Sequence, residues 1–356
     1  MTFTSRTVTL SNPPRVLAYL DTDTSATAAS ASHVVLLLHG FLDNCHSFLP
    51  LLRELDAQRG LTRWLALDFA GHGRSSHGSR HCYATLDAAL DVADFLRALH
   101  IQRLSLVGHS YGGGVAVLVA NALGPKLVDR VVLLDALGPY AAHAHDYPRL
   151  LHEAAHFEVS SSQPHSSLLH AAEYRAKKNF VGTMHVDDAL LLAERGTIPS
   201  DSAPGSVVWN YDPLLKRSSP SRITVEQTQQ CWRELRVPTL VIVAVDGLFA
   251  AMYTPVGRAL TQFGVVSSLL GQLLALALWL IATLGLRHRL GAIVGKLEAA
   301  SLFGARMRAL RRAKHVTLHT VDVRGGGHHV HMRFAKLIAE QLRAFLPALQ
   351  QPTKKA

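Results

Sequence analysis

The sequence predicts an α/β fold with a doubly wound, mostly parallel sheet, a helical cap insertion and one extra apolar helix. Short apolar runs alternate with segments whose apolar residues recur at helical spacing, a pattern typical of strands covered by helices on both faces. The run Leu104–Val107 leads through GHSYG at 108–112 into an alanine- and valine-rich segment. Strand, G-x-S-x-G turn and helix in this order predict a nucleophile elbow.

The composition limits the classes of partner. Of 356 residues, 48% are hydrophobic, which is ample for a core, and the net charge is +10 with histidines neutral. The charge favours anionic surfaces, but it forms no recognised nucleic-acid motif, so we expect no nucleic-acid partner. Cys45, Cys82 and Cys231 lack metal-ligand spacing, so we expect no metal and free thiols in a reducing compartment. The N-terminus lacks a signal-peptide pattern, which predicts an intracellular, cytoplasmic protein.

The elements follow from the hydrophobic pattern in chain order. Two short runs flank a turn at Asn12-Pro13-Pro14 and predict a hairpin, whereas the later runs are uninterrupted and predict buried strands. The predicted strands are 6–10, 16–20, 34–38, 64–67, 104–107, 131–134, 239–243 and 316–323. The predicted helices are 47–55, 83–99, 113–123, pieces near 165–178 and 186–195, and 334–345.

Ser110 is the candidate nucleophile. The turn around it is so tight that bulky residues two positions away would collide, and Gly108 and Gly112 remove that conflict. The N–H of Tyr111 lies at a helix N-terminus, where negative charge is favoured. A second backbone N–H, from Phe41 in the loop after the first buried strand, is expected to complete an oxyanion hole.

Four motifs in this order resemble the α/β-hydrolase superfamily: HGF at 39–41, DFAGHGRS at 68–75, GHSYGG at 108–113 and GGHHVHM at 326–332. More narrowly, LLDALGP at 133–139 and the stretch 209–227 resemble its serine hydrolase-like branch. The resemblance implies an α/β-hydrolase core at 1–139 and 236–350, with a helical cap at 140–235 over the site. Residues 252–294 depart from the family pattern and form an apolar insertion within the core.

A serine nucleophile needs a base and a group that orients the base. The resemblance makes the first histidine of GHHVHM, His328, the base. The acid is open between two positions that each follow a predicted strand. We favour Asp246, in the commoner place, although AVDG is one residue shorter than the usual spacing. Asp135, in DALGP, is the alternative.

The other motif residues are expected to support the site rather than react. His39, Gly40, Gly108, Gly112 and Asp68 belong to this supporting set, and Asp68 is expected to tie down the G-x-G-x-S loop. A serine at the elbow implies an acyl-enzyme, so the predicted activity is hydrolysis of a carboxylic ester, thioester or amide without a cofactor. The rival hypothesis is a catalytically silent hydrolase fold that binds a ligand or serves as a membrane scaffold.

Residues 259–286 contain no charged side chain, and the apolar run 265–286 is long enough to cross a bilayer. Basic residues follow it, which suits anionic headgroups. A single crossing would separate Ser110 from His328, so it excludes a working triad. We therefore expect residues 260–290 to insert shallowly into a membrane surface or to pack against a second copy, with crossing as the third hypothesis. The apolar segment also suggests a lipid-like ester as substrate.

Overall fold

The structure is a computed structural model, and it describes most of the chain. The described residues are 3–11, 13–22, 33–56, 62–78, 82–160, 162–179, 184–248, 310, 312–321 and 325–346. The predicted apolar insertion at 252–294 lies outside them. Among the residues described, no helix is both long enough and apolar enough to cross a bilayer.

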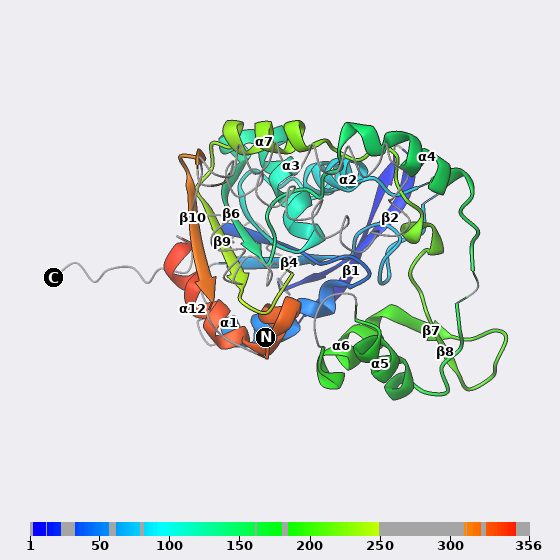
Figure 1. Ribbon diagram of the computed structural model, residues 1–356. Coiled ribbons are helices and arrows are strands. Elements are labelled where there is room, and N and C mark those ends of the chain that lie inside the picture. Colours follow the sequence, from blue (N-terminus) through cyan, green and yellow to red (C-terminus); the bar gives the residue numbers. More distant parts are fainter. Residues whose placement is uncertain are drawn as a thin grey trace.

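An eight-stranded sheet forms the centre of the molecule, in the order β1-β2-β4-β3-β5-β6-β9-β10 (Figure 1). The bounds are β1 Thr4–Ser11, β2 Pro14–Asp21, β3 His33–Leu38, β4 Thr62–Leu67, β5 Leu104–His109, β6 Val128–Leu134, β9 Thr239–Ala244 and β10 Val316–Val321. β1 pairs antiparallel with β2 and β2 with β4, while the other neighbours are parallel. The predicted doubly wound, mostly parallel sheet is therefore confirmed.

Helices cover both faces of the sheet. The helices α2 (Thr85–Ala98), α3 (Tyr111–Leu127) and α7 (Val225–Glu234) pack on one face, and α1 (Leu49–Asp56) and α12 (Ala335–Phe345) on the other (Figure 1). Successive side chains of one strand enter opposite layers: Leu106 packs with α2 and α3, while Val107 packs with α1 and α12. Because both sides of each central strand are buried, these strands are predominantly apolar.

The segment between β6 and β9 carries its own small cluster. It contains α4 (Tyr147–Ala155), α5 (Leu168–Lys177), α6 (Val186–Gly196) and the hairpin of β7 (Thr197–Pro199) and β8 (Val207–Trp209). Ala172, Leu192 and Trp209 pack there, apart from the two core layers. By contrast, α7 begins at a capping box formed by Thr224 and Gln227 and buries Trp232 against the core. The division into core and cap stays a prediction.

β9 and β10 flank the predicted apolar insertion, and they are parallel neighbours in register from Thr239 and Val316. The hypothesis of a membrane crossing at 265–286 concerns residues outside those described, and it stays a prediction. After β10, α11 (Val330–Arg333) and α12 return along the sheet edge, and the short turn before α11 carries His328.

Candidate active site

Ser110 lies between the end of β5 and the start of α3, as the elbow motif predicts. Its backbone has φ 51° and ψ −113°, a region that a non-glycine residue adopts only under strain. Its N–H donates to the Leu134 carbonyl at 3.0 Å, which holds the turn against β6. A Cβ at Gly108 would collide with the Gly112 backbone, and one at Gly112 with the Leu38 carbonyl. Both glycines are therefore required by the close approach of the chain.

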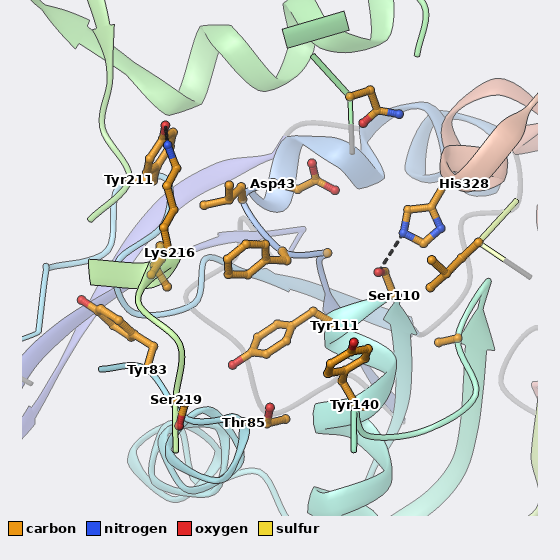
Figure 2. Close-up of a pocket in the computed structure, with 18 of the residues that line it drawn as sticks. Asp43, Tyr83, Thr85, Ser110, Tyr111, Tyr140, Tyr211, Lys216, Ser219 and His328 are labelled. Atoms are coloured by element: carbon orange, nitrogen blue, oxygen red, sulfur yellow. Dashed lines mark hydrogen bonds between the residues drawn. The ribbon is translucent and has the colours of Figure 1, made fainter. Parts of the chain in front are cut away.

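His328 lies within reach of the serine. Its Nε2 is 2.8 Å from Ser110 Oγ, and its Nδ1 is 2.6 Å from Asp135 Oδ2 (Figure 2 shows the Ser110 contact). Because a carboxylate only accepts hydrogen bonds, the proton resides on Nδ1 and leaves the Nε2 lone pair facing the serine hydroxyl. This is the tautomer that a general base needs.

The preference for Asp246 as the partner of His328 is wrong, since the histidine contacts Asp135. Asp135 directly follows β6, is fully buried and has a φ of 45°. Its carboxylate also accepts from the N–H of Ala244 at 3.2 Å and of Leu248 at 2.7 Å. A Cβ at Gly247 would collide with this carboxylate, so glycine there gives Asp135 its space. The loop after β9 encloses the acid rather than supplying it.

Asp246 has a different contact at the same sheet edge. Its Oδ2 accepts from the Gly325 N–H at 2.6 Å. Gly325, with a φ of 93°, begins the turn that presents His328. Asp246 thus links the loop after β9 to the turn that carries His328. Its contact there, Gly325, lies two residues before the 3₁₀ helix Gly327–His329.

The loop after β3 approaches the elbow from the other side. The N–H of Gly112 donates to the His39 carbonyl at 3.0 Å, and His39 Nε2 accepts from the Phe69 N–H at 3.0 Å. The buried His39 therefore joins three loops, which matches the expected support role. Phe41 and Tyr111 both line the cavity that contains Ser110, so the two expected oxyanion donors belong to residues beside the nucleophile.

Asp68 is completely buried and structural. It accepts from the N–H of Cys45 at 2.8 Å and of Arg74 at 3.0 Å, and from Arg195 Nε at 2.7 Å. Burial raises the pKa of its carboxyl, but Arg195, His39 and the backbone donors outweigh burial and hold the pKa below its usual range. Asp68 therefore ties the G-x-G-x-S loop as expected, and through Arg195 it also reaches α6.

A buried polar network behind His328 was not foreseen. Asp43 accepts from Arg175 Nη2 at 2.9 Å and from His329 Nε2 at 3.0 Å, while His109 Nε2 donates to the His328 carbonyl at 2.9 Å. Burial opposes the charge on Asp43, but His329 and Arg175 outweigh it and hold its pKa well below normal. The network links α5 to the turn that carries the base. His109 and His329 belong to the motifs GHSYGG and GGHHVHM, but the sequence did not indicate their contacts with this network.

The ligand-type atoms of Asp43, His109 and His329 lie within 4.8 Å of one another, so this trio has the atoms to hold a metal ion. Arg175 binds the same carboxylate, and its fixed positive charge opposes a second cation there. Burial and the neighbouring histidines hold the pKa of His109 well below normal, which keeps this ring neutral. We therefore interpret the trio as a structural support of the histidine turn.

Ser110 and His328 line a cavity of about 790 Å³, a volume within the range of small-molecule binding sites. The core contributes the loop at 40–43, the elbow and the loop after β6, while α5 and the segment 209–222 line the remaining sides (Figure 2). Ser110 and His328 lie at one side of this cavity, and Tyr211 and Lys216 lie across from them.

The chain matches a family model, curated proteins and a solved structure. Residues 33–166 match the family described as "alpha/beta hydrolase fold". The chain is 29% identical over 231 residues to a serine hydrolase-like protein of Danio rerio, covering 63% of this chain and 69% of that protein. It is 31% identical over 227 residues to human serine hydrolase-like protein 2, covering 60% and 69%. A solved structure of a hypothetical Pseudomonas aeruginosa protein superposes with TM-score 0.70 and 28% identity, covering 96% and 98%.

Proposed function

Because this chain belongs to the α/β-hydrolase superfamily, in its serine hydrolase-like branch, we propose that it cleaves a carboxylic ester, thioester or amide through an acyl-enzyme on Ser110. The fold and the relatives support a hydrolase. The observation that carries the finer proposal is the hydrogen-bonded series from Ser110 Oγ through His328 to Asp135, at the side of a substrate-sized cavity. The ester is the preferred substrate because an alkoxide or phenoxide leaves more readily than an amine.

The geometry supports a two-step reaction. Ser110 Oγ attacks the carbonyl carbon while His328 Nε2 accepts the hydroxyl proton, and Asp135 stabilises the resulting imidazolium. His328 then gives that proton to the leaving oxygen as the carbon–oxygen bond breaks. In the second step a water molecule attacks the acyl-enzyme and its proton passes to the same Nε2. His328 then returns that proton to Ser110 Oγ as the bond between Oγ and the acyl carbon breaks, which releases the acid product.

The oxyanion of each tetrahedral intermediate needs donors that are in place before reaction. We assign this role to the backbone N–H groups of Phe41 and Tyr111, whose residues flank Ser110 in the cavity. The contact from Gly112 N–H to the His39 carbonyl fixes the two loops relative to each other. Because the donors belong to the backbone, side-chain substitutions at these positions test their role poorly.

The rival hypothesis of a silent fold is disfavoured by the aligned acid, base and serine, because a binding scaffold has no need of that alignment. A lipid-like substrate or a membrane surface stays a prediction, as does pairing with a second copy. Both depend on residues 260–290, which lie outside the described residues.

Labelling of the purified protein with a fluorophosphonate probe tests the proposal, because the probe reacts only with an activated serine. We expect stoichiometric labelling that Ser110→Ala abolishes, while Ser218→Ala, which alters a second cavity serine, leaves it intact. The absence of labelling in folded wild-type protein between pH 6 and 9 would contradict an assembled hydrolase site. Labelling that survives in Ser110→Ala would place the nucleophile elsewhere.

A further inference from the structure

The charged side chains that line the cavity beside Ser110 are mostly cationic. Its cationic lining residues are Arg175, Lys178, Lys216, Arg217 and Arg222, whereas Asp43 is the one carboxylate among its described lining residues. Asp43 is already bound by Arg175 and by His329. Lys178, Lys216 and Arg222 therefore line the cavity with no further carboxylate among its described lining residues.

We propose that the ester bound here carries an anionic group, a carboxylate or a phosphate, on its end distant from the scissile carbonyl. The inference rests on the proposed hydrolase function and names the substrate class of the same site. An anion at this position would form charge-assisted hydrogen bonds, which are about twice as strong as neutral ones.

Three of the cations come from three different segments. Lys178 is the C-cap residue that follows α5, Lys216 ends the turn at Pro213–Lys216, and Arg222 precedes α7. Within the described residues, none of the three forms an ion pair with a carboxylate. Their convergence on one cavity is produced by the fold rather than by a run of basic residues in the sequence.

Two of these cations are held by aromatic rings. Lys216 Nζ lies 4.7 Å from the centroid of the Tyr211 ring, and it also donates to the Tyr211 hydroxyl at 2.7 Å. The Arg222 guanidinium lies 5.3 Å above the Tyr140 ring. An ammonium has three donors and a guanidinium five, so these ring contacts orient the cations while donors remain to bind an anion.

Glu153, outside the cavity lining, is the acidic neighbour of this region. Arg222 contributes to the low pKa of Glu153, after the hydrogen bonds from Ser218 and Arg149. Both Glu153 oxygens are taken, Oε1 by Arg149 at 2.6 Å and Oε2 by Ser218 at 2.9 Å. Glu153 therefore attenuates the charge of Arg222 from a distance, and among the residues that the structure describes it forms no ion pair with Lys178 or Lys216.

The distance between the cations and the catalytic pair indicates that the ligand must extend across the cavity to contact both. Lys216 and Tyr211 lie across the cavity from Ser110 and His328 (Figure 2). Apolar side chains line the cavity as well; among them are Phe41, Leu42, Leu137, Leu215, Trp209 and Leu248. An acyl group with an apolar middle and an anionic end satisfies both features.

Matched p-nitrophenyl esters test this inference. The probes are the hydrogen suberate, with a free terminal carboxylate, its methyl suberate counterpart, which is neutral at the same position, and the 7-phosphonoheptanoate, which carries a phosphonate after the same six methylene groups. We expect kcat/KM for at least one anionic ester to exceed that of the neutral ester by about tenfold or more, mainly through KM. The preference should shrink as salt rises from 0.05 to 0.5 M, because exposed charges are screened. The better anionic ester distinguishes a carboxylate from a phosphate ligand.

The variant Lys178→Gln/Lys216→Gln/Arg222→Gln should remove the preference, so that the ratio of kcat/KM between the anionic and the neutral ester falls to about one. Lys177→Gln, which alters an exposed neighbour on α5 outside the cavity lining, is the matched control and should retain the preference. Equal kcat/KM for charged and neutral esters in wild type, with Ser110 still labelled by the fluorophosphonate, would overturn this inference alone. Absence of labelling would instead overturn the hydrolase proposal. A preference that survives in the triple variant would also refute the assignment.

Discussion

Replacing Asp135 by asparagine is expected to lower the turnover of an ester substrate by about 10⁴-fold, as loss of a triad acid does. The asparagine amide would donate to His328 Nδ1, so the ring proton would move to Nε2. That nitrogen could then no longer accept the proton of Ser110, although the two side chains would still be in contact. The measurement is kcat for a p-nitrophenyl ester, with the rate of fluorophosphonate labelling as a second readout.

Asp246→Asn is the matched control, because Asp246 occupies the same edge of the sheet and also contacts the histidine loop. We expect its turnover to stay within a few fold of wild type, since an asparagine oxygen can still accept from Gly325. A melting curve for each variant separates lost catalysis from lost folding. A large loss in Asp246→Asn together with a small loss in Asp135→Asn would contradict the assignment of the acid.

The sequence alone did not determine which of these two aspartates contacts His328. Asp135 and Asp246 follow β6 and β9, which are adjacent parallel strands, so both carboxylates occupy one sheet edge. Strand order and spacing cannot decide which of two neighbouring carboxylates reaches His328, which lies 193 residues after Asp135 and 82 residues after Asp246. The decision depends on the positive φ of Asp135 and on the space above Gly247, which only the folded backbone defines.

The elements themselves were predictable for a physical reason. Central strands such as β3 and β5 are mostly apolar because both faces are buried, and the glycines of GHSYGG mark a turn that larger residues cannot form. Ser110 and His328 were predictable because each lies within a short motif that can be recognised in the sequence. The buried pairs were not, because Asp43 contacts Arg175 and Asp68 contacts Arg195 across separations of 132 and 127 residues.

The pair of Asp68 and Arg195 is expected to dominate stability. Both side chains are nearly inaccessible, at 0% and 1% exposed, and they are joined by a hydrogen bond of 2.7 Å. Asp68→Asn leaves the guanidinium buried without its counter-charge, so we expect unfolding free energy to fall by about 3–5 kcal/mol. Urea denaturation measures the change. Arg97→Gln, which breaks an exposed pair with Asp94, is the control and should leave the midpoint unchanged.

The pH dependence of that loss follows from the pKa of Asp68, which folding holds below its usual range. A depressed carboxyl pKa contributes stability above the pKa of the unfolded chain, about 3.9, and the contribution disappears as pH falls through the native pKa. The difference in unfolding free energy between wild type and Asp68→Asn should therefore be complete at pH 7 and shrink below about pH 4. A difference that stays constant down to pH 3 would show that asparagine acts by altering packing, because packing does not titrate, whereas the buried ion pair must.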